Sequence, residues 1–281
     1  MNRYASLALA LCCGLSLSAQ ATTVNTGQLF ISPNFFGGTG ASDQTVTQTG
    51  AISLSGSATG GFNSSGHGST FVDYGVIKLD GEAFGSLNAI SRGIFRDNVI
   101  ITAAGVATGT PGSLTYAIFV DGTLAVGTGS SAAGWQLQAD LGGGAFDINR
   151  SATLFGNDPS LGVHGYTGDP FGLYTATINF QFGIAMQLDV ELTSSAQAAY
   201  SGTSPVGTMP YASHDLSHSL YWGGISNVSA NGVQVASFTA AGESGTNYSL
   251  SLAPVPEPAS WASLLGGLGI VFATLRRRLK H

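Results

Sequence analysis

Hydrophobic and polar residues alternate along much of the chain, and the clearest run extends over residues 174–192. Its even positions, from Tyr174 to Leu192, are almost all apolar, whereas its odd positions carry polar or small side chains. A period of two is typical of a β-strand with one face on a core and the other in water. A single strand of this length would extend about 63 Å at roughly 3.3 Å per residue, so we expect a break or a change of sheet near Gly183.

Dipeptides that favour positive backbone φ angles separate several of the shorter apolar runs. Asp80-Gly81, Asp121-Gly122 and Asn231-Gly232 each lie between two stretches rich in β-branched and aromatic residues. Such pairs are typical of type I′ turns, so we predict three β-hairpins at these positions. Four further strands are predicted at residues 46–54, 98–102, 135–141 and 216–222.

The pattern before residue 254 contains many short strands and no helical periodicity of useful length. Residues 156–172 and 194–214 each contain two prolines, and we predict long loops there. Short strands separated by glycine-rich segments favour an all-β chain. We therefore predict that residues 22–253 form one antiparallel two-sheet sandwich of the jelly-roll-like type.

The N-terminal residues have the three parts of a secretory signal peptide. A basic residue near the start is followed by an apolar stretch over residues 7–17 and by Ala19-Gln20-Ala21, a small-x-small cleavage site. We predict a signal peptide at residues 1–21, with Ala19 and Ala21 at the cleavage site. Both cysteines, Cys12 and Cys13, lie within it, so the exported domain is expected to lack disulfides and thiol chemistry.

The C-terminal residues combine a proline-rich acidic motif, an uncharged apolar stretch and a basic end. Pro256-Glu257-Pro258 precedes residues 259–275, which reach roughly 25 Å as a helix, slightly short of a bilayer core of about 30 Å. Local thinning and snorkelling of basic side chains allow such a span. The cytoplasmic basic stop that follows places the domain outside and consists of Arg276, Arg277, Arg278 and Lys280.

This tripartite tail resembles the PEP-CTERM sorting signal of Gram-negative, exopolysaccharide-making bacteria, which is read by the membrane protease exosortase. The resemblance covers residues 254–281 and implies a sorting motif formed by Val255, Pro256, Glu257 and Pro258. With the signal peptide it implies two partners, the Sec machinery and exosortase. It also implies an inner-membrane intermediate and delivery to the cell surface or extracellular matrix. An ordinary single-pass anchor with a proline linker is the alternative.

The predicted exported domain is strongly acidic. Residues 22–253 contain four basic and 14 acidic residues, which gives a net charge of −10, whereas the whole chain has −6. A surface of this sign without basic patches repels nucleic acid, so we expect no nucleic-acid partner.

Two patterns resemble metal sites. His214 and His218 are four residues apart, but on an extended strand they lie about 13 Å from each other, too far for one ion. Five carboxylates could supply oxygen ligands to calcium, but their spacing is not that of an EF-hand. We therefore assign no metal ligand and keep calcium as a low-ranked cofactor. These carboxylates are Asp80, Glu82, Asp97, Asp140 and Asp147.

Two patterns suggest contact with glycans. The loop aromatics Tyr166, Phe171 and Tyr211 are candidate contacts for sugar rings, whereas Trp135 and Trp222 are expected in the core. Asp189 and Glu191 are about 7 Å apart on one strand face, within the range of an inverting glycosidase pair. Their face is otherwise polar and wet, so we assign no catalytic residue and expect no enzyme.

The sequence predicts a structural or adhesive protein of biofilm or floc exopolysaccharide, delivered by exosortase. A carbohydrate-binding module of the matrix is the first alternative, and a glycan hydrolase is the second.

Overall fold

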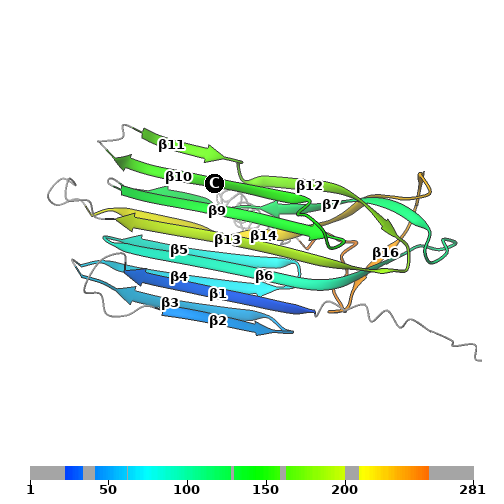
Figure 1. Ribbon diagram of the computed structural model, residues 1–281, viewed down its shortest axis with the longest axis horizontal. Helices are drawn as coiled ribbons and strands as arrows, with labels where there is room; N and C mark the ends of the chain where they lie inside the picture. Colours follow the sequence, from blue (N-terminus) through cyan, green and yellow to red (C-terminus); the bar gives the residue numbers. More distant parts are fainter. Residues whose placement is uncertain are drawn as a thin grey trace, which may run out of the picture.

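The computed structural model describes residues 23–33, 42–61, 63–127, 130–158, 163–199 and 209–252. These residues form 16 β-strands in two antiparallel sheets and no helix, and the strands run along the long axis of the molecule (Figure 1). This arrangement confirms the predicted all-β class with two antiparallel sheets; the jelly-roll connectivity stays a prediction. Within the described residues no helix is long and apolar enough to cross a bilayer. The predicted signal peptide and the predicted membrane segment lie outside these residues.

Sheet A runs from one edge to the other in the order β11-β10-β9-β13-β6-β1-β2, with β16 beside β6. Its strands are β1 (Val24–Pro33), β2 (Ser42–Gln48), β6 (Leu87–Thr102), β9 (Ser130–Leu141), β10 (Ile148–Asp158), β11 (Val163–Gly168), β13 (Ala185–Ala199) and β16 (Thr239–Gly242). Sheet B has the order β12-β7-β14-β5-β4-β3, with β8 and β15 beside β14. Its strands are β3 (Ile52–Thr59), β4 (Ser65–Asp73), β5 (Val76–Phe84), β7 (Pro111–Val120), β8 (Thr123–Val126), β12 (Gly172–Gln181), β14 (Tyr211–Ala230) and β15 (Val233–Gln234).

The predicted break near Gly183 is confirmed, and it is a change of sheet. β12 lies in sheet B and β13 in sheet A, with residues 182–184 between them. Gly183 has a φ of 71°, a conformation that side chains other than glycine rarely adopt. A Cβ atom at this position would also lie 2.6 Å from Oγ1 of Thr108. Glycine at this position therefore allows the alternating run of residues 174–192 to continue from sheet B into sheet A.

Of the three predicted hairpins, only the one at Asn231-Gly232 is present. Asn231 and Gly232 have φ angles of 48° and 79°, and they join β14 to β15. At Asp80-Gly81 the prediction is wrong, because β5 passes straight through both residues and pairs with β4 on one side and β14 on the other. At Asp121-Gly122 it is also wrong: β7 and β8 do not pair with each other, and both pair with successive parts of β14.

Three other predicted segments were also wrong in their bounds. Residues 46–54 are not one strand, because β2 ends at Gln48 and β3 begins at Ile52. The predicted loop at residues 156–172 contains β11, and the one at 194–214 is wrong at both ends, because β13 ends at Ala199 and β14 begins at Tyr211. The strands predicted at 98–102, 135–141 and 216–222 lie within β6, β9 and β14. The prolines that suggested these loops lie outside the strands: β11 lies between Pro159 and Pro170, and β14 begins directly after Pro210.

The core lies between the two sheets and is filled by the inward-facing row of each strand. On β7, Leu114, Tyr116 and Ile118 are fully buried. Trp222 stacks on Tyr116 at 5.5 Å between ring centroids, and it meets Tyr248 edge-on at 5.2 Å. Trp135 and Trp222 are both core residues, as predicted, with 3% and 0% of their surface exposed.

The last described residues close the sandwich at one end. β16 adds to sheet A beside β6, and the chain then crosses to sheet B, where the Leu252 amide donates to the Trp222 carbonyl at 2.8 Å. Between these points Tyr248 is buried, and its hydroxyl donates to Asp97 at 2.9 Å. We call Thr239–Leu252 the C-terminal clasp. Its Glu243 accepts a hydrogen bond of 2.8 Å from Thr23, so both ends of the described chain lie together.

Candidate functional site

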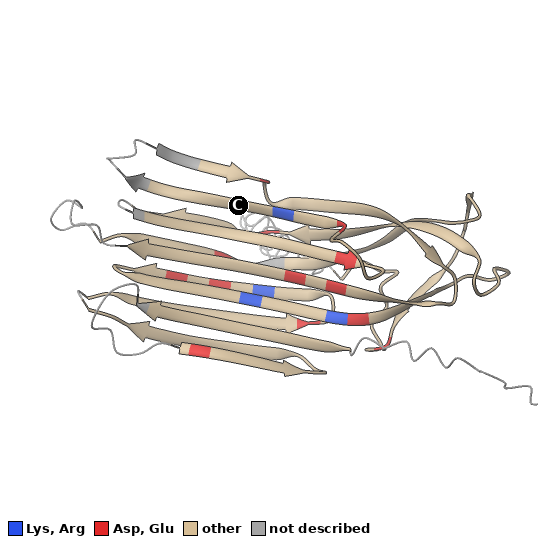
Figure 2. Cartoon of the chain, in the orientation of Figure 1, with Lys and Arg blue, Asp and Glu red and all other residues tan. Residues whose placement is uncertain are grey.

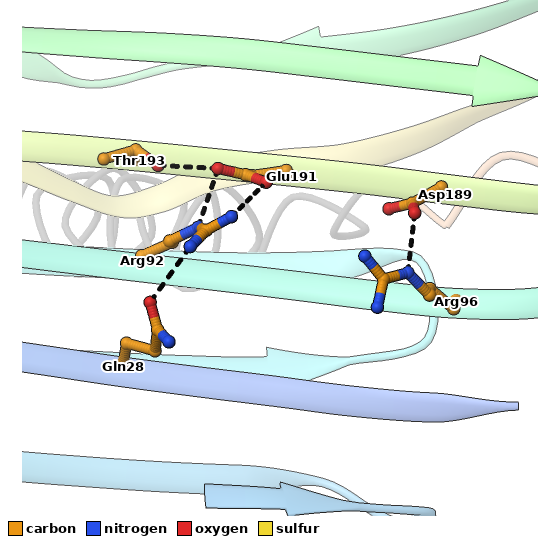
Figure 3. Close-up of polar contacts among 6 residues, drawn as sticks. All are labelled: Gln28, Arg92, Arg96, Asp189, Glu191 and Thr193. Carbon is orange, nitrogen blue, oxygen red and sulfur yellow. Dashed lines mark hydrogen bonds and ion pairs between the residues drawn. The ribbon is translucent and has the colours of Figure 1, made fainter. Parts of the chain in front are cut away.

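The outward face of sheet A carries a row of ion pairs between β6 and β13 (Figure 3). Arg92 donates from Nε and from one terminal nitrogen to the two carboxylate oxygens of Glu191, both at 2.7 Å. Arg96 donates from Nε to Asp189 at 2.6 Å. These pairs follow from the register, which places Asp189 opposite Arg96 and Thr193 opposite Arg92.

Neighbouring polar side chains extend this row. Arg92 also donates to the amide oxygen of Gln28 on β1 at 3.2 Å, and Thr193 donates to Glu191 at 3.2 Å (Figure 3). The hydrogen bonds with Glu191 raise the pKa of the Arg92 guanidinium above its usual value. We call Arg92, Arg96, Asp189 and Glu191 the arginine ladder. With Gln28 it joins β1, β6 and β13 by charge-assisted hydrogen bonds on a solvent-exposed face.

Asp189 and Glu191 share this outward face, as the alternation predicted. Their environment differs from that of a glycosidase pair, in which one carboxyl must hold a proton for the leaving group. Each carboxylate instead accepts hydrogen bonds from an arginine on the neighbouring strand β6. The geometry supports a structural role for both residues in holding β6 against β13.

The carboxylates considered for calcium are dispersed over the two sheets. Asp80 and Glu82 lie on β5, where Asp80 pairs with His67 at 3.6 Å and burial raises the pKa of its carboxyl. Asp97 is buried on β6, with 1% of its surface exposed, and it accepts hydrogen bonds from the Ser244 amide at 3.1 Å and the Tyr248 hydroxyl at 2.9 Å. Asp97 is thus the anchor of the C-terminal clasp.

Asp140 and Asp147 lie at the two ends of the loop between β9 and β10, Asp140 as the next-to-last residue of β9 and Asp147 directly before β10. Asp140 accepts from the Gly144 amide at 2.8 Å, and Asp147 accepts from the Leu141 amide at 3.1 Å and from Tyr116 at 3.2 Å. Within the described part of the chain, no three histidine, cysteine or acidic residues gather closely enough to hold a metal ion. Calcium binding stays a prediction.

His214 lies on β14, within the last residues of the predicted loop 194–214, and its side chain points into the core. The ring is fully buried, and within the described residues neither nitrogen makes a hydrogen bond of normal geometry. Burial lowers the pKa of His214 to about 3, although the nearby backbone of Ala89 offsets part of this effect. The side chain of His218 lies outside the described residues.

Gly81 makes room for this histidine on the neighbouring strand. The two residues are directly opposite each other in the pairing of β5 with β14. A Cβ atom on Gly81 would lie 2.3 Å from Nε2 of His214, so no larger residue fits there without a shift of the ring. Gly81, which suggested a turn in the sequence, is therefore needed because its missing side chain leaves space for the buried ring of His214.

The three aromatic residues predicted to contact glycans lie on different parts of the fold. Tyr166, on β11, is 45% exposed and donates to the Asp169 carbonyl at 2.5 Å. Phe171 precedes β12 and stacks on Trp135 at 5.4 Å. Tyr211 begins β14 in sheet B and packs against Phe84 at 4.7 Å. The structure therefore places Tyr166 and Phe171 at the β11–β12 corner and Tyr211 on the other sheet.

A shallow polar groove lies on the outward face of sheet A, over β9, β10 and β13. Its volume is about 280 Å³, and Gly134 forms part of its floor. The side chains around it are mostly hydroxyls and an amide, from Gln136, Ser151, Thr153, Thr193 and Ser195. Sequence reasoning missed this groove and the arginine ladder, because both depend on which distant strands become neighbours.

The C-terminal clasp leads directly into a region that matches a known protein-sorting signal. Residues 254–278 match the family model of the PEP-CTERM protein-sorting motif and begin two positions after Leu252. This match confirms the predicted PEP-CTERM signal, which lies outside the described residues, whereas the roles of Val255, Pro256, Glu257 and Pro258 within it stay predictions. A search of curated proteins and a search of solved structures each gave no match.

The fold and the tail together define an exported all-β protein. The chain carries the PEP-CTERM signal by which exosortase recognises its substrates, and this signal implies a location at the cell surface or outside the cell.

Proposed function

We propose that the protein is a structural or adhesive component of the surface or of the extracellular matrix, in biofilm or floc exopolysaccharide. The observation that carries this proposal is the sorting motif at residues 254–278, attached to a two-sheet β-domain. On this proposal the Sec machinery exports the chain, the apolar tail holds it in the inner membrane, and exosortase then releases the domain.

The surface of the domain supports a structural role. Four charged side chains on the outward face of sheet A are engaged in ion pairs between β6 and β13, namely Arg92, Arg96, Asp189 and Glu191. The clasp ties the last strand to Asp97 and Trp222, so the body is held closed up to the start of the sorting signal. A domain closed in this way resists fraying where the tail pulls on it.

Replacement of the motif tests the sorting claim. Alanine at Pro256, Glu257 and Pro258 is expected to leave the protein in the inner membrane, measured by immunoblot of membrane and surface fractions. Alanine at Asp43 and Thr45, which are exposed on β2, is the control and should leave delivery unchanged. Surface delivery of the motif variant at the wild-type level would contradict the proposal.

A second candidate is a carbohydrate-binding module of the matrix, and the polar groove over β9, β10 and β13 favours it. Hydroxyl and amide groups at the surface suit the hydrogen-bonding groups of sugars. Retardation in gels that contain exopolysaccharide tests this candidate. Alanine at Gln136 should abolish the retardation if the groove binds, whereas alanine at Tyr166 and Tyr211 should abolish it if the aromatic residues bind.

A further inference from the structure

Strand β12 is an edge of sheet B, and its backbone is open to a further strand. It pairs with β7 over ten consecutive residues, from Gly172 opposite Val120 to Gln181 opposite Pro111, without a register shift. Among the described strands, none pairs with its other side. Because hydrogen-bonding direction alternates along a strand, half of its backbone N–H and C=O groups point away from the sheet.

The other edges of the two sheets have features that oppose pairing. β11 is six residues long, and its partner β10 shifts register between Phe155 and Asp158. β2 carries Asp43, and Gln44 on β2 donates from Nε2 to the Ser55 carbonyl of β3 at 3.0 Å. Short strands, irregular pairing, charges and covering side chains are the usual means by which proteins prevent edge-to-edge association. β12 has no charge, no proline and no register shift; β3 shares these features, but the Gln44 side chain covers one of its carbonyl groups.

The inward face of β12 is also incompletely covered. Tyr174, Ala176 and Ile178 point toward the core but stay partly exposed, whereas the inward residues of neighbouring β7 are fully buried. The outward face carries Leu173, which is 62% exposed. A further strand at this edge would pair with the open backbone groups of β12 and cover its partly exposed apolar side chains.

We propose that β12 pairs with β12 of a second copy of this chain, antiparallel and about a two-fold axis. The charge distribution favours a second copy: residues 22–253 carry a net charge of −10, but β7 and β12 carry none (Figure 2). Two copies therefore repel each other over much of their surfaces, whereas β7 and β12 themselves add no charge to the contact.

The sequence of β12 is compatible with this symmetry. With the axis at Thr177, Leu173 lies opposite Gln181 of the partner subunit and Ala176 lies opposite Ile178 of the partner subunit. Outward residues then meet outward residues and inward residues meet inward residues, because the period of a strand is two. Pairing covers the half-buried apolar row on both copies and extends sheet B across the dimer. This interface goes beyond the sorting function and does not depend on how the tail is processed.

Sedimentation of the exported protein, recovered from the producing cell, tests the interface. Wild type is expected to be a dimer. Lysine at both Thr175 and Thr177, whose side chains are exposed, should weaken self-association by about tenfold or more, because like charges then face each other. Glutamate at the same two positions should do the same, and an equimolar mixture of the two variants should form a mixed dimer. Circular dichroism checks that each variant is folded.

Lysine at Ser53 and Ser55 is the matched control, because these residues are exposed on β3 at the opposite edge of the same sheet. This variant should remain a dimer. A wild-type protein that is monomeric at about 100 μM would overturn the proposal, and so would a lysine variant at Thr175 and Thr177 that dimerises as wild type does. A mixture of the lysine and glutamate variants that stays monomeric would also count against it.

Discussion

The buried histidine on β14 should make the stability of the protein depend on pH in a region where carboxylates contribute little. His214 is fully buried with a pKa of about 3, whereas in the unfolded chain it has an ordinary pKa near 6.5. Below pH 6.5 the unfolded state therefore binds one more proton than the folded state. The free energy of unfolding falls as the pH falls, from about 6.5 down to about 3.

The size of this effect follows from the two pKa values. The loss approaches about 1.4 kcal/mol for each pH unit once the pH is well below 6.5. Between pH 7 and pH 5 it amounts to about 2 kcal/mol for this single group. Replacement of His214 by leucine, which has a similar volume, removes the titrating group and two buried nitrogens that make no hydrogen bond of normal geometry within the described residues. The variant should lose about 2 kcal/mol less than wild type over this interval.

Urea unfolding of the exported protein at pH 7, 6 and 5, followed by tryptophan fluorescence, measures the difference. The comparison between wild type and variant cancels the contribution of other groups. Leucine at His67, whose side chain is 54% exposed on β4, is the control for loss of a histidine. If wild type and the His214→Leu variant show the same dependence on pH, the inference of a neutral buried ring is wrong.

Three further substitutions have outcomes that can be predicted from the packing. Gly81→Ala should destabilise the domain by about 2 kcal/mol or more in urea unfolding, since its Cβ meets His214, and the added change His214→Ala should recover part of the loss. Tyr248→Phe removes a donor to buried Asp97, so it should lower stability by about 1–3 kcal/mol and speed limited proteolysis within the clasp; unchanged proteolysis would contradict the clasp. Gly183→Ala should lower the thermal midpoint, because the residue needs a φ of 71°; an unchanged midpoint would contradict the need for glycine there.

The class of the fold could be predicted from the sequence because it depends on local pattern. Alternation of apolar and polar residues marked the inward rows, and the change of sheet at Gly183 followed from the length of one run. Asn231-Gly232 was predicted correctly because both residues have positive φ angles that only a few residue types adopt. These features are set by neighbours in the chain.

The errors arose where distant strands decide the outcome. Asp80-Gly81 has the composition of a turn, but pairing with β4 and β14 on both sides keeps β5 straight, and the glycine serves His214 instead. The ion pairs of Arg92 and Arg96 join residues 99 and 93 positions apart in the chain. The hydrogen bond from Tyr248 to Asp97 joins residues that are 151 positions apart in the chain. Without strand register these partners could not be chosen among the other polar residues.

The intact mass of the protein recovered from the cell surface tests the central claim most directly. The account predicts a mass that lacks the signal peptide and the apolar and basic residues 259–281, because exosortase has acted near Pro256-Glu257-Pro258. Surface protein that still carries residues 259–281 would contradict it.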